Sequence, residues 1–384
     1  MKTQIESRRS RVALNSFSGQ ISFALVLLAC ALSSTGAAGL KTKNVFLITT
    51  DGLRWQEVFT GADESLLNKT NGGVRDVEAL RKECWRATPE ERRKALLPFL
   101  WSEVAMKGQI FGNRAKGSDA HITNTRKFSY PGYNEFLTGV ADARIDSNKR
   151  IPNANTNVFE WLNARPGFRG KVAAVVNWDV IPWILNTERS RLPAWTGFPL
   201  PPTAPAIKVS PELDALLRDT TPLWDNIILD SFTARAAVDY VKHEKPRAFY
   251  LAFGETDEWA HEGRYDYVLH AARNVDRFIQ RLWEIAQSLP AYREKTTFII
   301  ATDHGRGDGP RAWRDHGEKV DGAENIWIAV IGPDTPPLGE RTHCAPVTQS
   351  QIAATVAEFL GEDYCAAFPQ AAGPIADVIR HTIK

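Results

Sequence analysis

The chain has 384 residues, of which 43% are hydrophobic and 24% charged, and this balance excludes a disordered chain and a string of small modules. Its 47 lysines and arginines nearly balance its 45 aspartates and glutamates, and no basic run appears beyond the short "SRRSR" near the start. Binding to a nucleic-acid duplex is therefore not expected. One large α/β domain that acts on a small or moderate substrate fits the composition better.

The N-terminus has the pattern of a signal peptide over residues 1–38. A basic start with Arg8, Arg9 and Arg11 precedes the apolar stretch "ISFALVLLACAL", and the small residues "SSTGAAG" follow it. This apolar stretch is too short to cross a bilayer comfortably as a permanent helix. We therefore expect an exported protein that is periplasmic or secreted.

The cysteines also bear on the compartment. Within the apolar stretch, "LLAC" is similar to a bacterial lipobox, which would place a lipid anchor on Cys30 after cleavage. Leu28 is not the small residue that a lipobox prefers, and this favours an ordinary signal peptide. Cys344 and Cys365 are close enough in the sequence to form a disulfide in an oxidising compartment, which would leave Cys84 as a structural or free thiol.

Five apolar runs are typical of buried strands in a parallel sheet, and helical patterns lie between them. The clearest helical pattern covers 264–289, where apolar residues recur at helical spacing and would face the core. This alternation favours an α/β fold with a doubly wound, mostly parallel sheet covered by helices on both faces. The five runs are "NVFLITT" from Asn44, "KVAAVVN" from Lys171, "RAFYLAF" from Arg247, "TTFIIAT" from Thr296 and "NIWIAVI" from Asn325.

Residues 181–222 interrupt this alternation with many prolines and little periodicity, and we predict a small cap or lid insertion near the site. The rest of 41–384 would form one catalytic domain. Trp183, Trp195 and the neighbouring Trp224 could stack on a nucleobase or another flat leaving group. The alternative, which is favoured, is that these rings only pack the lid onto the domain.

Aspartates and histidines, which are ligands of zinc-like cations, follow three of the predicted strands. Because ligands bind at the carboxyl ends of the strands in open α/β sheets, we expect these side chains to converge there. An isolated Asp-His-Gly would more simply be a solvated turn, so the interpretation depends on the whole set. The set is large enough for two ions with positions open for substrate. It comprises Asp51 after the first run, Asp257 and His261 after the third, Asp303 and His304 after the fourth, and His316 in the loop beyond.

A nucleophile is available in "TRKFSYPGYNEFLTG", where Pro131 favours a first helical turn and Gly139 a helix end. Ser129 would then lie just ahead of a helix N-terminus, where free N–H groups and the helix dipole favour an alkoxide and a bound phosphoryl group. Coordination to a metal would activate this otherwise weak nucleophile. The alternative is an N-cap serine, and Thr123 and Thr125 are rival hydroxyls further from the helix start.

The chain resembles the alkaline phosphatase superfamily through "ITTDGLRW", "FSYPGYNEFLTG", "GETDEWAHEG", "ATDHG" and "RDHGE", in the expected order from about Asn44 to Pro333. The opening Asp-Gly-x-Arg is most similar to the type I phosphodiesterase/nucleotide pyrophosphatase branch. The resemblance implies a phosphoester hydrolase with two Zn²⁺ ions, or another divalent metal. One ion would be bound by Asp257, His261 and His316, and the other by Asp51, Asp303, His304 and Ser129.

This branch usually has an asparagine three residues after the nucleophile, in contact with the phosphate, whereas this chain has Gly132 there. Asn134 or Lys127 could contact the substrate in its place. The resemblance implies in-line attack by Ser129 on a small-molecule phosphate mono- or diester, followed by hydrolysis of the phosphoserine. The backbone N–H groups of Ser129 and Tyr130 could stabilise the transition state together with the side chain of Asn134.

Other functions are compatible with the same residues. A phosphonate hydrolase, a sulfate ester hydrolase or a phosphate mutase could use this scaffold, although export argues against the mutase and Ser129 against a sulfatase that needs a cysteine there. An exported metal-binding protein without activity is a further alternative, although no ligand or nucleophile is missing. His121 or His343 could replace His316, because His316 lies far along the loop from its strand.

Overall fold

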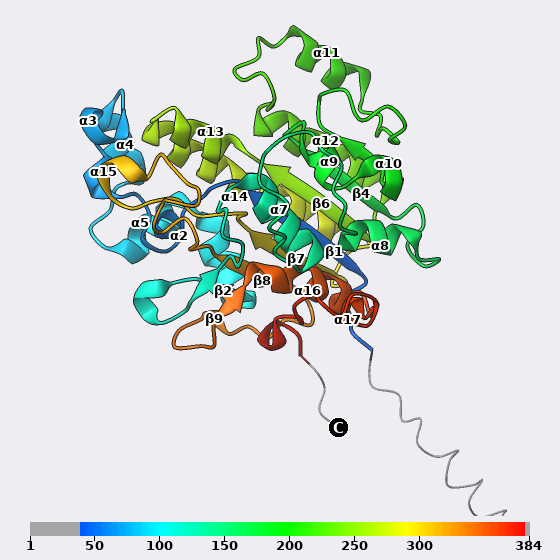
Figure 1. Ribbon diagram of the computed structural model, residues 1–384. Helices are drawn as coiled ribbons and strands as arrows, with labels where there is room; N and C mark the ends of the chain where they lie inside the picture. The colour runs from blue at the N-terminus through cyan, green and yellow to red at the C-terminus, as the bar shows by residue number, and fades with distance from the viewer. Residues whose placement is uncertain (1–38, 381–384) are drawn as a thin grey trace, which may run out of the picture. The chain divides into compact units, whose positions relative to one another are not determined.

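The computed structural model describes residues 39–380 and has an eight-stranded sheet at its centre (Figure 1). The strands are β1 (Asn44–Thr50), β2 (Gln109–Phe111), β3 (Ala120–His121), β4 (Val172–Val176), β5 (Ala194–Trp195), β6 (Ala248–Phe253), β7 (Thr296–Ala301), β8 (Ile328–Ile331), β9 (Gly339–Glu340) and β10 (Val347–Thr348). Their order in the sheet is β5-β4-β6-β1-β7-β8-β2-β9, and β10 pairs separately with β3. β1 is buried along its whole length, as a central parallel strand should be.

Helices cover both faces of this sheet, and alternate residues of β1 face different helices. One face packs against α12 (Asp230–Glu244) and α14 (Tyr265–Ser288), and the other against α7 (Ser129–Thr138), α8 (Val158–Ala164) and α16 (Ile352–Phe359). Phe46 and Ile48 belong to the core on the α12 and α14 side, whereas Val45 and Leu47 belong to the core on the other side. The predicted α/β fold, with a mostly parallel sheet between helical layers, is confirmed.

The segment between β1 and β2 adds several helices to the core on the α14 side. In α5 (Pro89–Leu96), for example, the sequence determines where the helix begins: Thr88 forms a capping box with Glu91, and Pro89 occupies the first turn.

The remaining helices are α2 (Trp55–Thr60), α3 (Lys69–Gly72), α4 (Val77–Cys84), α6 (Ala105–Lys107), α9 (Ile181–Ile184), α10 (Thr187–Ser190), α11 (Pro211–Asp219), α13 (Glu255–His261), α15 (Gly309–Ala312) and α17 (Tyr364–Ala367).

β8 is the exception to the parallel arrangement that the sequence predicts for all five apolar runs. It pairs antiparallel with both β7 and β2, so the prediction of a parallel strand at "NIWIAVI" is wrong. The connection from β7 to β8 covers residues 302–327 and contains only the short helix α15. Without a crossover helix, the chain re-enters the sheet at the edge where it left, and the next strand runs the opposite way. The whole loop therefore stays at the carboxyl edge of the parallel strands.

Residues 181–222 contribute to the main domain as well as to a projecting segment. β5 joins the edge of the sheet beside β4, with Trp195 opposite Val175. Trp195 is 9% exposed and packs in the core, so the structure favours the interpretation in which this ring only packs. α11, at the top of Figure 1, lies in the part of the segment that projects from the sheet.

The disulfide expected from the sequence does not form. Cys84, Cys344 and Cys365 are all free thiols. Cys344 Sγ lies 3.5 Å from Ser118 Oγ, whereas Cys365 Sγ, on α17, lies 3.6 Å from the carbonyl of Ala372. The two cysteines are near one another in the sequence, but the fold gives each thiol a separate partner.

The predicted signal peptide, including Cys30, lies outside the described residues. Within residues 39–380, none of the helices combines the length and the apolar character that a membrane span needs. Both export and a lipid anchor therefore rest on the N-terminal sequence pattern alone.

Candidate active site

The carboxyl edge of the sheet brings together side chains that the sequence places after separate strands. Asp51 follows β1, Asp303 and His304 follow β7, and His304 Nε2 lies 3.3 Å from both Asp51 Oδ1 and Asp303 Oδ2. The Gly52 N–H donates a 3.0 Å hydrogen bond to Asp303 Oδ1. Gly52 has a φ of 60°, and a Cβ there would lie 2.5 Å from Asp257 Oδ1, so glycine is required. We refer to Asp51, Asp303 and His304 as the Asp51 group.

Two carboxylate oxygens of the Asp51 group, Asp51 Oδ1 and Asp303 Oδ2, have no hydrogen-bond partner in the described part of the chain. Both residues are buried, and both of these oxygens approach His304 Nε2. Burying a polar group without a partner is costly, so such atoms need an explanation. One ligand atom from each of the three residues falls within a span of 4.8 Å. The donor set therefore fits a divalent metal ion.

The protonation of the Asp51 group also depends on a nearby positive charge. Burial raises the pKa of Asp51 well above its usual range and Asp257 raises it further, although Tyr133 Oη donates a 3.0 Å hydrogen bond to Asp51 Oδ2. Burial and the charge of Asp51 also raise the pKa of Asp303. A bound cation reverses this direction by favouring the ionised form. A metal ion would therefore keep both side chains as carboxylates at neutral pH.

A second set of candidate ligands is carried mainly by α13, which follows β6. Asp257 and His261 lie four residues apart on this helix, with Asp257 Oδ2 3.1 Å from His261 Nε2. His316, from the loop before β8, places its Nε2 atom 3.0 Å from His261 Nε2 and 3.7 Å from Asp257 Oδ1. We refer to these three residues as the Asp257 group. The rings of His316 and His304 stack with centroids 4.0 Å apart, so the two groups adjoin.

Backbone carbonyls orient two of the histidines for metal binding. The Nδ1 atoms of His304 and His316 lie 2.9 Å and 3.3 Å from the carbonyl oxygens of Gly305 and Lys127. A proton on Nδ1 can be donated to the carbonyl, which leaves the lone pair of Nε2 for a metal. Burial and the neighbouring His304 hold the pKa of His316 well below its usual value, so its ring is neutral.

Ser129 is the first residue of α7, and Phe128 is the N-cap residue. The helix ends at Thr138, followed by Gly139 in a left-handed conformation, as the sequence predicts. Ser129 is 5% exposed, and its Oγ lies 3.4 Å from His304 Nε2. The hydroxyl therefore lies beside the Asp51 group and in the first turn of a helix, where the helix dipole favours negative charge.

The sequence matches the model of a known protein family over most of the candidate site. The model of the type I phosphodiesterase / nucleotide pyrophosphatase family matches residues 100–327. The chain belongs to this family. The matched range contains Ser129 and the Asp257 group, whereas Asp51 precedes it. The protein is thus a hydrolase of the alkaline phosphatase superfamily, in which metal dependence is typical, and its family acts on small-molecule phosphoesters.

Solved structures share the fold of this phosphodiesterase-family chain but little of its sequence. The phosphonate monoester hydrolase SpPMH from Silicibacter pomeroyi is 14% identical, with a TM-score of 0.52 over 87% of this chain and 76% of its own. The lipoteichoic acid synthase LtaP from Listeria monocytogenes is 9% identical, with a TM-score of 0.53 over 85% and 74%. The alkaline phosphatase PafA is 11% identical, with a TM-score of 0.51 over 90% and 100%. A search of the curated proteins found no match.

Asn134, which the sequence suggests as a phosphate contact, does not present a free amide. Its side chain is fully buried in α7. Its Nδ2 atom donates to the Val140 carbonyl at 2.9 Å, and its Oδ1 atom accepts hydrogen bonds from Asn153 and Asn155, both at 3.1 Å. Asn134 therefore holds the following loop in place, and its expected contact with the substrate has no support in this geometry.

Lys127, the other suggested substrate contact, is engaged elsewhere as well. Its Nζ atom donates to Glu324 Oε2 at 2.9 Å, and it reaches the site only through the carbonyl that faces His316. The rival nucleophile Thr123 donates its hydroxyl to Glu135 at 2.9 Å. None of these side-chain groups is directed at the Asp51 group.

The alternative histidine ligands lie away from the cluster. His121 Nδ1 is 3.3 Å from Asp119 Oδ2, and His343 is exposed beside Gly117. In the described residues, the second set that could hold a metal ion consists of Asp257, His304 and His316, so it contains neither of these histidines, whereas His261 adjoins it. His316 is thus the loop histidine that the fold brings to the Asp257 group.

Arg306 belongs to the site and was not predicted from the sequence. It is 2% exposed, and its guanidinium contacts Asp257 Oδ1 and lies 3.2 Å from His261 Nδ1. Its Nε atom also donates to the Trp313 carbonyl at 3.0 Å, in the loop that carries His316. A Gly-rich turn after a strand gives no signal of where a long side chain will point, so these contacts depend on the tertiary fold.

Arg306 places a positive charge directly against a carboxylate of the Asp257 group. Burial opposes ionisation of Asp257, but the charge of Arg306 holds its pKa well below the usual range. A guanidinium can only donate, so His261 Nδ1 must accept, and the neutral ring then carries its proton on Nε2. That proton can be donated to Asp257 Oδ2, 3.1 Å away. A metal ion could bind at Nε2 only if this proton left the ring, so the contact with Arg306 weakens His261 as a ligand.

We expect Arg306→Met to strengthen binding at the Asp257 group. The substitution removes a positive charge that opposes a divalent cation and frees Nδ1 of His261, and the expected gain in zinc affinity is about tenfold or more. Calorimetric titration of the metal-free protein should therefore show two unequal sites in the natural chain and a smaller difference in the variant. Arg306→Lys, which keeps the charge, is the control. Loss of the weaker site in Arg306→Met would mean that the guanidinium mainly positions the ligands.

Asn148 was also not predicted from the sequence, and it lies beside the nucleophile. Its Oδ1 atom accepts a 2.9 Å hydrogen bond from the N–H of Tyr130, the residue after Ser129. This N–H group is one of the donors expected to stabilise the transition state, so in this structure it already has a partner. The exposed Asn148 side chain also carries an Nδ2 donor at the start of α7. Asn148 could therefore supply the amide that is missing at Gly132.

Proposed function

We propose that the protein is an exported two-zinc hydrolase of phosphate mono- or diesters that acts through a phosphoserine at Ser129. The observation that carries the proposal is the position of Ser129 Oγ, 3.4 Å from His304 Nε2 at the start of α7. Imidazole and carboxylate ligands with positions open for substrate support zinc. Diesters are the first class to test because the family description names phosphodiesterases. Export rests on the N-terminal sequence.

In the proposed reaction, Ser129 Oγ gives up its proton to water and attacks phosphorus, and the bond from phosphorus to the leaving oxygen breaks. Bound metal ions would supply positive charge that activates the serine and stabilises the leaving oxygen. The Asp51 group would hold one ion next to Ser129, and the Asp257 group would hold the other. The N-terminal turn of α7 and the Asn148 amide would donate hydrogen bonds to the nonbridging oxygens. Water then attacks phosphorus and gives up a proton, the bond from phosphorus to Ser129 Oγ breaks, and Oγ takes up a proton as the phosphate leaves.

A substrate panel combined with acid quenching tests this proposal. The panel would contain 4-nitrophenyl phosphate, bis(4-nitrophenyl) phosphate, a 4-nitrophenyl phosphonate ester and 4-nitrophenyl sulfate. We expect faster turnover of the phosphates than of the other two esters. Mass spectrometry of quenched samples should find a phosphoryl group on the peptide that contains Ser129, and elemental analysis should find two zinc ions per chain.

The same experiment separates the alternatives. A clear preference for the phosphonate or the sulfate would move the function to that class on the same fold. Two bound zinc ions without hydrolysis of any ester would favour an exported metal-binding protein. Turnover without a trapped phosphoserine under any quenching condition would contradict the covalent step.

A further inference from the structure

Glu135 lies on α7, the helix that begins with Ser129, and it is fully buried. Its Oε1 atom accepts hydrogen bonds from the N–H and the hydroxyl of Thr123 at 2.8 and 2.9 Å, and from the Ser350 hydroxyl at 3.2 Å. Its Oε2 atom accepts from the N–H and the Nδ2 of Asn124, both at 2.8 Å. A carboxylate only accepts hydrogen bonds and all of these groups can donate, so Glu135 holds the segment before the nucleophile against α7.

The helix that carries Glu135 is itself fixed against the Asp51 group. Gly132 packs directly on the backbone of Asp303, where a Cβ would lie 2.4 Å from the carbonyl oxygen. Gln349, which precedes Ser350, donates from Nε2 to the same carbonyl at 2.7 Å. The carboxylate of Glu135 is therefore a fixed point relative to the metal ligands, and a segment bound to it is fixed as well.

Asn124 connects Glu135 to Lys127. Its Nδ2 atom donates to Glu135, and its Oδ1 atom accepts a 2.9 Å hydrogen bond from the N–H of Lys127. Lys127 has a φ of 53°, in the left-handed region that a residue with a Cβ adopts only at a cost. Such a conformation persists only where the surroundings hold it. Asn124 holds the backbone of Lys127, while Glu324 holds the end of its side chain at 2.9 Å from Nζ.

The conformation of Lys127 matters because its carbonyl faces the site. The carbonyl oxygen lies 3.3 Å from His316 Nδ1. An oxygen of this kind can only accept, so it selects the neutral tautomer of His316 with the proton on Nδ1. The lone pair of Nε2 is then free for a metal ion at the Asp257 group. A change of Lys127 to negative φ would rotate this part of the backbone and turn the carbonyl away from the ring.

We infer that Asn124 is a positioning residue, which keeps Lys127 in its left-handed conformation and so fixes the tautomer of His316 that can bind a metal ion. Glu135 acts one step further away, because it holds the amide of Asn124. The inference rests on the proposed function in so far as His316 is taken as a zinc ligand. Contacts that orient a ligand in this way typically change metal affinity or activity by about 10- to 100-fold.

NMR of the metal-free protein with isotope-labelled histidine tests the inference without any substrate. The signals of His316 are assigned by their loss in His316→Ala. In the natural chain, the nitrogen chemical shifts should be those of a protonated Nδ1 and a bare Nε2, and in Asn124→Ala they should move toward one another. Calorimetric titration of Asn124→Ala should show zinc affinity at the Asp257 group lowered about tenfold or more, with the Asp51 group unchanged.

Two double variants separate the conformation of Lys127 from other effects of Asn124. Adding Lys127→Gly to Asn124→Ala should restore zinc affinity by about threefold or more, because glycine adopts positive φ without the cost of a Cβ. Adding Lys127→Ala removes the same lysine side chain and its pair with Glu324 but keeps the Cβ, so it should restore nothing. Equal zinc affinity in the two double variants would overturn the inference.

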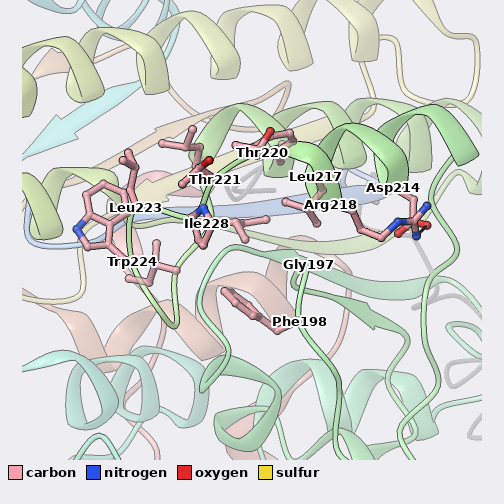
Figure 2. Close-up of a pocket in the computed structure, with 14 residues that line it drawn as sticks. Gly197, Phe198, Asp214, Leu217, Arg218, Thr220, Thr221, Leu223, Trp224 and Ile228 are labelled. Atoms are coloured by element: carbon pink, nitrogen blue, oxygen red, sulfur yellow. Dashed lines mark hydrogen bonds and ion pairs between the residues drawn. The ribbon is translucent and has the colours of Figure 1, made fainter.

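Ile228→Ala controls for a loss of stability alone. Ile228 lines a separate cavity of about 320 Å³ between α11 and α12, together with Leu217 and Trp224 (Figure 2). It is 9% exposed and packs in the core, so its truncation should lower the Tm. The His316 tautomer and both zinc affinities should nevertheless keep their natural values. If Ile228→Ala changed them as much as Asn124→Ala does, Asn124 would have only a structural role.

The outcomes keep the inference separate from the proposed function. Unchanged His316 shifts in folded Asn124→Ala protein overturn the inference, even if the natural chain hydrolyses phosphoesters through Ser129. If the natural chain hydrolyses no ester, the proposed function fails, and the shifts still decide the role of Asn124. If Asn124→Ala does not fold, Glu135→Gln takes its place, because it keeps the size of the side chain but sets a donor against the donors that Glu135 now accepts from. The same change in the shifts is expected there.

Discussion

Replacing Ser129 with alanine should abolish phosphoester hydrolysis while leaving most of the zinc bound. Ser129 Oγ lies 3.4 Å from His304 Nε2, and no other hydroxyl of the described residues is hydrogen-bonded to that atom, so we expect no neighbouring group to replace it in the covalent step. Loss of a nucleophile typically costs several orders of magnitude, and we expect kcat to fall by about 1000-fold or more. The carboxylates and imidazoles remain, so zinc content measured by elemental analysis should change little.

Thr123→Ala is the matched control for this prediction. Thr123 also carries a hydroxyl in the segment before α7, but that hydroxyl donates to Glu135. Its removal should leave kcat within a few-fold of the natural value. If Ser129→Ala kept more than a small fraction of turnover at full zinc occupancy, Ser129 would not be the nucleophile. In that case, Thr123→Ala and Thr125→Ala would show whether a rival hydroxyl replaces it.

The strands and most of the cluster could be predicted because their signals are local. A fully apolar run such as "NVFLITT" needs burial on both faces, and β1 covers those residues. The residue after such a run must lie at the edge of the sheet, which is why Asp51 and Asp303 could be placed there. The helical spacing of Asp257 and His261 likewise put them on one side of α13. Each of these inferences depends on only a few neighbouring residues.

The direction of β8 could not be predicted, because burial on both faces gives the same apolar run in parallel and antiparallel strands. The information lies instead in the preceding loop, which contains no helix long enough for a crossover. The same loop has a second consequence. Because this loop begins and ends at the carboxyl edge, His316 can fold back against His304 although the two lie twelve positions apart in the sequence.

The polar contacts around the nucleophile were the least predictable part of the site. Asn134 has a suitable side chain and lies near Ser129 in the sequence, but the helix turns it into a buried network with Asn153 and Asn155. Asn148 lies much further along the chain, yet its loop returns to the start of α7. Sequence distance fixes neither outcome, since both depend on how the loop after α7 packs.

His316→Ala should lower the zinc content from two ions toward one ion per chain and reduce turnover steeply. Its Nε2 atom lies 3.0 Å from His261 Nε2 and 3.7 Å from Asp257 Oδ1, and its Nδ1 faces the Lys127 carbonyl, so its lone pair is directed at this group. His261 cannot compensate while Arg306 donates to its Nδ1. The Asp51 group keeps all of its ligands, and the remaining ion should therefore stay bound there. Elemental analysis and steady-state kinetics on the same samples measure both effects.

His121→Ala and His343→Ala are the matched controls, because each removes one imidazole outside the cluster. His121 is near Asp119, and His343 is exposed, so zinc content and turnover should both be preserved. Unchanged zinc stoichiometry in His316→Ala, with loss of one ion in either control, would move the ligand assignment to that histidine. If two sites are independent, removing a ligand from one leaves the other intact. Loss of both ions from the His316→Ala protein would therefore mean that the two ions form one shared centre, which the stacked rings of His316 and His304 would support.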